Sequence, residues 1–290
     1  MEFVFELLLA GFGGGVMGAY MGALPAFIMA GVVALAGGAA ALAGGADLTT
    51  GWIAFGAMFG PHVGFSSGVV ATAFAYNRKK IDDGGAITLA LNGIADPVVL
   101  LVGGITGVVG MVLFQVLSGL NFPADIPGFI VIIFGIFARL VFGKTGLFGK
   151  YDGKKNRTYL STGGAGGNNF IIALGLGILV SMIGSAMISA GISKDLVASA
   201  YPAFIFGIAA TTLIFAHVGG AVPGVHHMMF PAAVAFVSSG FNPLFGILFA
   251  VVGGLLGDFA GKLVNSYCDT HIDPPAIAIV TLTLLANLIW

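Results

Sequence analysis

The chain has 290 residues, of which 58% are hydrophobic and 8% are charged, and its formal net charge is −1. Soluble domains carry about 25% charged residues, so this composition excludes an ordinary soluble protein and indicates one that crosses a membrane several times. The small net charge gives no indication of nucleic-acid binding, and the single cysteine, Cys268, excludes an internal disulfide.

Long apolar runs set the expected architecture, because about 18 apolar residues in a helix cross the hydrocarbon core of a membrane. In chain order these runs cover residues 3–23, 25–45, 97–119, 126–144, 168–191, 200–216, 243–264 and 273–290. We therefore expect an all-α polytopic integral membrane protein with roughly eight to ten transmembrane helices.

Two further regions, residues 51–95 and 217–240, are apolar but interrupted by Gly, Pro, His and Asn. Irregular backbone is tolerated at membrane depth only where protein or a wet cavity satisfies its polar groups. The sequence therefore predicts short or re-entrant helices in these regions, packed inside the bundle.

Basic residues gather at positions 78–80 and between positions 144 and 157. Because positively charged loops face the cytoplasm, the polar stretch 146–167 is predicted to be a cytoplasmic linker. The connection at residues 269–273 has no neighbouring cluster of Lys or Arg and is expected on the opposite, outer face. We expect the plasma membrane of a bacterial or archaeal cell.

The linker would separate a first membrane repeat, residues 1–145, from a second, residues 168–290. Similar strings occur in the same order in both parts: GPHVGFSSGV (60–69) and AHVGGAVPGV (216–225), NGIADP (92–97) and SGFNP (239–243), LVGGITGVVG (101–110) and VVGGLLGDFAG (251–261), NFPADIP (121–127) and THIDPP (270–275). We interpret them as an internal two-fold pseudo-repeat, either parallel or inverted. Chance similarity in a Gly- and Ala-rich chain is the alternative.

Glycine is abundant, with 48 residues, and many glycines lie four positions apart, as Gly253, Gly257 and Gly261 do. Such stripes let helix backbones approach closely inside a membrane. We interpret most stripes as packing surfaces, which also makes a homo-oligomer conceivable. The alternative for some stripes is a slot lined by backbone.

His62 and His217 occupy matching places in the proposed repeat. A histidine at membrane depth is costly unless it is paired, and its ring can carry a proton, bind a metal or hydrogen-bond a solute. We therefore predict that these two residues form paired polar gates of a transport pathway. The alternative is a pair of neutral rings bonded to backbone carbonyls freed by the broken helices.

His226 and His227 are predicted to extend the lining of the same pathway. Neighbouring positions on a helix point about 100° apart, so both rings cannot easily face one metal. Metal-binding spacings such as CxxC and HExxH are absent from the sequence. Whether a metal binds stays open, and no cofactor is predicted.

Small polar side chains around the broken regions are also assigned to the pathway: Ser66, Ser67, Asn92, Asp96 and Asn242. Asp96 and Asn242 each precede a proline, where they are expected to cap the following helix. A helix start of this kind can also bind an anion or a dipolar solute if it lies inside the membrane.

Five more charged positions carry predictions. Asp258 and Lys262 can pair along one helix face and are predicted to couple an ion, with a plain ion pair as the alternative. Asp125 and Asp273 lie near prolines and are expected to be simple caps at outer helix starts. Arg139 is expected to extend its charge to the cytoplasmic interface.

These features together predict a channel or secondary transporter that passes a small solute or ion at the repeat interface, and not an enzyme. The expected partners are the lipid bilayer and the solute. Two alternatives remain: a non-transporting membrane subunit or scaffold of a larger complex, and an intramembrane subunit whose histidines bind a metal or haem.

Overall fold

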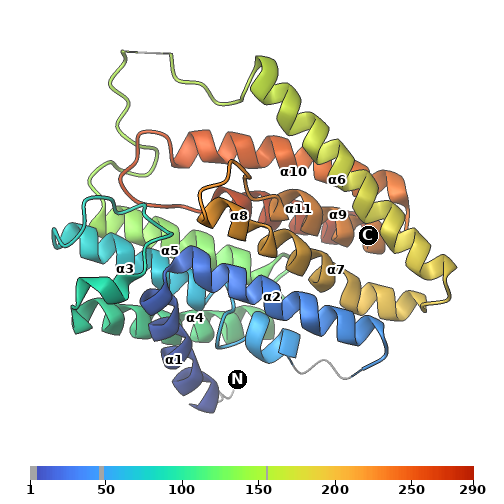
Figure 1. Cartoon of the computed structure of the whole chain (residues 1–290), viewed down its shortest axis with the longest axis horizontal. Helices are drawn as coiled ribbons and strands as arrows, with labels where there is room; N and C mark the ends of the chain where they lie inside the picture. Colours follow the sequence, from blue (N-terminus) through green and yellow to red (C-terminus); the bar gives the residue numbers. More distant parts are fainter. Residues whose placement is uncertain (1–4, 46–48, 155) are drawn as a thin grey trace.

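The computed structural model describes residues 5–45, 49–154 and 156–290, and this part of the chain contains helices and no strand (Figure 1). The elements before the linker are α1 (Phe5–Met21), α2 (Ala23–Leu42), the π-helical turn η1 (Thr50–Ala54), α3 (Gly64–Asn77), the 3-10 turn η2 (Leu91–Ile94), α4 (Pro97–Gly119) and α5 (Ile126–Phe142). After it come α6 (Gly163–Ser189), α7 (Lys194–Thr211), α8 (Leu213–His217), α9 (His226–Ser238), α10 (Pro243–Val264) and α11 (Pro274–Ile289).

The predicted all-α class is confirmed, and each predicted span corresponds to a helix. The first two residues of the span predicted at 3–23 lie outside the described residues. Five helical segments are long and apolar enough to cross a membrane: α2, α4, α6, α10 and the continuous run Lys194–His217 of α7 and α8. Helices α1, α5 and α11 are apolar but shorter.

The two broken regions form short helices, as the sequence predicts. Helix α3 has 14 residues and α9 has 13, and irregular backbone precedes both. At 1.5 Å per residue, neither is long enough to cross a hydrocarbon core of about 30 Å alone.

Four helices begin with a polar cap followed by proline. Asp96 accepts a hydrogen bond from the N–H of Val98 at 3.0 Å, and Asn242 accepts one from Leu244 at 3.0 Å. The predicted caps at these two positions are therefore confirmed. Asp125 and Asp273 cap α5 and α11 in the same way.

Glycines allow the closest helix contacts. The backbone of Gly15 in α1 lies against the carbonyl of Gly103 in α4, and a Cβ at Gly107 would overlap the carbonyl of Gly11. In α10, Gly253 lies against the carbonyl of His227. The packing interpretation of these glycines is confirmed, because a side chain at any of these sites would collide with backbone.

Two pairs of helices pack the part of the chain before the linker against the part after it, and the helices of each pair are antiparallel. In the first pair, Gly31 of α2 packs against Ala210 of α7, and Gly38 packs against Phe204. In the second pair, α5 and α11, Gly128 faces Val280 while Gly135 faces Ile272. Figure 1 shows α5, α10 and α11 running in similar orientations through the bundle, with α6 tilted across its edge.

The linker packs against the connection between α10 and α11. The N–H of Lys150 donates to the carbonyl of Tyr267 at 3.0 Å, and the N–H of Lys144 donates to Asp269 at 2.7 Å. Thr145 also donates to Asp269 at 2.7 Å. Burial would raise the pKa of Asp269, but these hydrogen bonds lower it below its usual value.

These contacts show that the expected placement of residues 269–273 on the face opposite the linker is wrong. The reason is physical: Asp269 is satisfied by hydrogen bonds from Lys144 and Thr145, immediately before the linker, so the connection needs no cluster of Lys or Arg beside it. Gly84, in the connection between α3 and α4, also pairs with Thr270. We call this end of the bundle the linker face.

Arg139 does not extend to an interface as expected, because its side chain is completely buried. Its guanidinium donates to the hydroxyl of Thr270 at 2.5 Å, to the carbonyl of Thr270 at 2.7 Å and to the carbonyl of Leu147 at 3.0 Å. Arg139 therefore joins α5 to the linker and to the connection between α10 and α11.

We expect Arg139→Met to lower the free energy of unfolding by about 3 kcal/mol, because buried acceptors on Thr270 and Leu147 lose a charged donor. The melting temperature of the detergent-solubilised protein measures the effect. Arg78→Met is the matched control, since Arg78 is exposed with its guanidinium 5.9 Å from the ring centre of Phe74. Its effect should stay below about 1 kcal/mol, and equal losses in the two variants would contradict the assigned role of Arg139.

Candidate functional site

A cavity lies between the elements before and after the linker, where α2 and α3 meet α7, α9 and the start of α11. It consists of two adjoining pockets with volumes of about 190 and 30 Å³, which share Phe27, Phe65, His226 and Asp273. We call them together the central cavity. Its walls are mostly apolar, and its polar side chains come from Asp125, His226, His271 and Asp273.

Both aspartates of the central cavity are also helix caps. Asp125 accepts a hydrogen bond from the N–H of Gly128 at 2.6 Å, and Asp273 accepts one from the N–H of Ala276 at 2.8 Å. His271 Nε2 lies 3.3 Å from the second oxygen of Asp273. The expectation that these aspartates cap helices is confirmed, but they do so at a cavity within the bundle.

His226 stands at the start of α9 and is 5% exposed. Its ring centre lies 4.8 Å from that of Phe27 and 6.5 Å from that of Phe206. Its Nδ1 atom is buried without a hydrogen-bond partner. His226 therefore brings an imidazole with one unsatisfied nitrogen to the lining of the cavity, and an unsatisfied buried polar atom of this kind often marks a functional site.

His227 faces a different cavity, although it is the next residue of the chain. It lines a pocket of about 480 Å³ together with Asn168, Asn169 and Asp258, which we call the Asn168 cavity. The rings of His226 and His227 are perpendicular, at 89°, with their centres 6.0 Å apart. The two imidazoles therefore point to separate spaces, and the described residues contain no group of three metal-ligand side chains.

His62 is completely buried just before α3, and both of its ring nitrogens lack a hydrogen-bond partner. The ring stacks on Phe114 at 4.5 Å and 17°. Phe114 in turn lines a third pocket of about 340 Å³, which we call the Trp52 cavity. Pro61, the preceding residue, lines the central cavity, so residues 61 and 62 lie between the two spaces.

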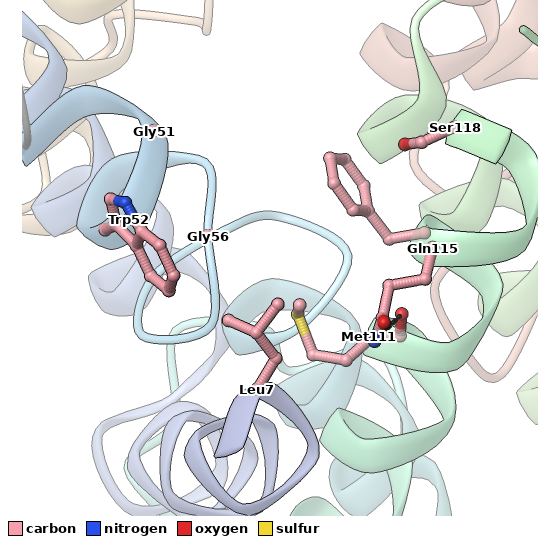
Figure 2. A pocket seen from close by; sticks show the side chains of 8 residues that line it. Leu7, Gly51, Trp52, Gly56, Met111, Gln115 and Ser118 are labelled. Atoms are coloured by element: carbon pink, nitrogen blue, oxygen red, sulfur yellow. Dashed lines mark hydrogen bonds between the residues drawn. The ribbon is translucent and has the colours of Figure 1, made fainter. Parts of the chain in front are cut away.

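The Trp52 cavity is formed by α1, η1 and the second half of α4. In Figure 2, Trp52 lies on one side, and Gln115 and Ser118 of α4 lie on the other. Leu7 and Met111 point toward each other at its base. The cavity is largely apolar, with Gln115 and Ser118 as its polar side chains from α4.

His217 has a different environment from His62. It ends α8 and is exposed, whereas His62 is completely buried. Asn92 is exposed in η2, and Asp96 forms an ion pair with Lys80 at 3.4 Å. The structure therefore does not gather these predicted pathway residues around the central cavity.

Most of the remaining predicted residues have local partners. Ser66 donates to the carbonyl of Pro61 at 3.0 Å, whereas the hydroxyl of Ser67 is buried in α3 without a hydrogen-bond partner. Asp258 and Lys262 form the expected pair at 3.3 Å, and both contact Ser161 before α6. Their pairing attaches the end of the linker to α10 and places Asp258 in the wall of the Asn168 cavity.

Sequence reasoning missed the cavity roles of Asp125, Asp273 and His271. An Asp followed by proline within two positions occurs before both α5 and α11, and this signal was sufficient to predict the caps. It contains no information on how deep in the bundle each helix begins. His271 precedes the second of these signals by two residues and was not singled out.

A protein-family model matches residues 1–159 and 174–290, which together make up most of the chain. The chain belongs to this family of unknown function, DUF7973. No curated protein and no solved structure matches the chain. The family assignment covers all of the central cavity but supplies no activity.

Gly253→Ala tests the close contact that holds His227. The added methyl would overlap the carbonyl of His227, so α9 or α10 must shift, and we expect a loss of about 1–3 kcal/mol. Gly261→Ala is the matched control in α10, because its nearest neighbour would be Pro274 at an ordinary 3.7 Å. Melting temperatures in detergent compare the two, and a loss at Gly261 as large as that at Gly253 would contradict the packing argument.

Proposed function

We propose that this DUF7973 protein is embedded in a membrane and passes a small solute or ion through the central cavity. The observation that carries the proposal is the arrangement of three helix starts, those of α5, α9 and α11, around one cavity. They place Asp125, His226 and Asp273 in its walls. Ionisable groups inside an apolar membrane bundle are costly, and where they occur they commonly mark a transport pathway or a binding site.

Exposed apolar side chains support the membrane location. On α4, Val98, Leu101, Ile105 and Val109 are each more than 40% exposed and recur every three or four residues. On α6, Ile171, Leu179 and Met182 behave similarly, as do Leu244, Leu248 and Leu255 on α10. Large apolar faces of this kind are unfavourable in water and favourable against lipid.

The proposed duplication gains support from the order and the contacts of the helices. Each part has two helices, a short element, and then three more helices. The order before the linker is α1, α2, η1, α3, α4 and α5, and the order after it is α6, α7, α8, α9, α10 and α11, if the turn η2 before α4 is left out. Both α1 with α4 and α6 with α10 form close contacts. The string PAFI occurs at residues 25–28 in α2 and at 202–205 in α7.

The antiparallel pairs indicate the orientation of the proposed repeat. If α2 corresponds to α7 and α5 to α11, the axis that exchanges each pair lies perpendicular to the helices. That axis would lie in the plane of the membrane, and the repeat would be inverted. In this alignment His227, and not His217, corresponds to His62, since the carbonyls of both lie against a glycine of the next long helix, Gly110 in α4 and Gly253 in α10.

An inverted repeat would place the Trp52 cavity and the Asn168 cavity on opposite faces of the membrane. The Asn168 cavity includes Gly257 and Asp258 of α10, whose end contacts the linker through the bond from Arg157 to Leu263 at 2.8 Å. The Trp52 cavity lies at the end of α4 away from Lys80 and the linker face. Alternate opening of these cavities to the central cavity, past His62 and His227, would constitute transport, and no catalytic step is required.

The first test is flux into liposomes that contain the purified protein. We expect faster passage of at least one small solute or ion, among potassium, an alkylammonium salt and small polyols, than in empty liposomes. His226→Ala should lower that rate by about tenfold, equivalent to about 1.4 kcal/mol, because it alters the wall of the central cavity. His217→Ala is the control and should leave the rate unchanged, since its ring is exposed at the end of α8. Equal rates with and without protein would favour the scaffold alternative.

A second test addresses the proposed inverted repeat and needs no transport assay. In a Cys268→Ser background, Ser118→Cys marks the Trp52 cavity and Asn168→Cys marks the Asn168 cavity. Both positions are exposed. A membrane-impermeant thiol reagent, applied to oriented vesicles, should label Asn168→Cys from the linker face and Ser118→Cys from the other face. Labelling of both from one side would rule out the inverted arrangement.

A further inference from the structure

We propose that the central cavity binds a small protonated amine, with Asp125 and Asp273 as its counter-charges and phenyl rings as its walls. This inference rests on the proposed function in one respect, since it takes the same cavity as the substrate site. It goes further by naming the chemical class of the substrate, which the lining side chains can discriminate.

The charges around the cavity favour a cation. Asp125 and Asp273 contribute two carboxylates, and neither Lys nor Arg is among the described residues that line the cavity. The starts of α5 and α11 each contribute a partial charge of about +0.5, which leaves about one net negative charge. The start of α9 reduces this charge to about −0.5 when both imidazoles of the cavity are neutral, so a monovalent cation fits better than an anion or a divalent metal. A protonated His271, 3.3 Å from Asp273, would compete with that cation.

The walls favour an organic cation over a bare ion. Phe27 lies between Phe65 and Phe206, with ring centres 5.7 and 5.4 Å away, and all three rings line the smaller pocket. Phenyl rings attract ammonium groups and also cover the attached carbons. Alkali and alkaline-earth ions instead need several oxygen ligands, whereas two carboxylates are the oxygen-bearing side chains among the described residues that line the cavity.

His226 provides an independent indication of a ligand with N–H donors. The ring is 95% buried, being 5% exposed, it lines both pockets, and its Nδ1 has no partner in the protein. A neutral imidazole offers one acceptor nitrogen, and a protonated amine offers N–H donors. The larger pocket, about 190 Å³, leaves room for an alkyl group of several carbons beside Leu24, Ile87 and Leu213.

The experiment measures binding to the full-length protein in detergent. The probe is n-butylammonium chloride, and the controls are 1-butanol, its neutral isostere, and sodium chloride at the same ionic strength. Isothermal titration calorimetry gives the dissociation constant, and the melting temperature gives an independent measure of stabilisation. We expect saturable binding of butylammonium alone.

Two variants remove the counter-charges without removing the caps. Asp125→Asn and Asp273→Asn keep a capping side chain, as Asn242 does at α10, so both proteins should fold. Each should weaken butylammonium binding about tenfold or more, because a buried charge loses its partner. Asp96→Asn is the matched control: Asp96 also caps a helix before proline, but it pairs with Lys80 outside the cavity.

The results separate this inference from the proposed function. If butylammonium does not bind, if 1-butanol or sodium chloride gives the same response, or if Asp125→Asn and Asp273→Asn bind as the wild type does, the amine site is wrong. Flux of other solutes would then still support transport. Specific binding of butylammonium without any flux would support the site and count against the transport function.

Discussion

The N–H groups at the start of a helix need hydrogen-bond partners, and inside an apolar bundle water cannot supply all of them. In this protein the side chains of Asp125 and Asp273 satisfy that requirement for α5 and α11. Capping by aspartate also places a carboxylate in the interior of the bundle at the start of each of these two helices. The same residues that allow these helices to begin within the bundle therefore give the central cavity its charge.

Glycine determines how closely the rest of the bundle can surround that cavity. The carbonyls of His62 and His227 lie against Gly110 of α4 and Gly253 of α10. His62 lies just before the short helix α3 and His227 lies in the first turn of the short helix α9, and each contacts the middle of a long helix. A side chain at either glycine would separate the two elements, so the positions of both buried histidines depend on the absence of a single methyl group.

Much of the fold follows from the sequence, because helix length, apolar runs and caps before proline are local properties. The starts of α4 and α10 at Pro97 and Pro243 were predictable from Asp96 and Asn242 alone. The place of Arg139 was not predictable, because its partners, Thr270 and Leu147, are determined by tertiary packing and not by distance along the chain. Its sequence context suggested an arginine at the membrane interface, whereas in the structure Arg139 is buried and connects α5 to the linker and to the α10–α11 connection.

The candidate site was predictable only in part, for a related reason. Buried histidines at broken helices were a sound expectation for His62, His226 and His227, since imidazole and helix breakers rarely coincide in apolar segments. Similar strings, however, paired His62 with His217, whose ring is exposed. String similarity ignores the differing lengths of the connections, whereas in the proposed repeat the contacts of their carbonyls with Gly110 and Gly253 would relate His62 to His227.

In the proposed repeat, the two halves would contribute different side chains to the central cavity. If His62 corresponds to His227, then Pro61 corresponds to His226, and both of these residues line the central cavity. The two aspartates would be contributed equally by the halves, but both imidazoles, those of His226 and His271, would come from the second half alone. Imidazoles on one side only of a symmetric pair of carboxylates would give a ligand a single preferred orientation, because only that side offers acceptor nitrogens.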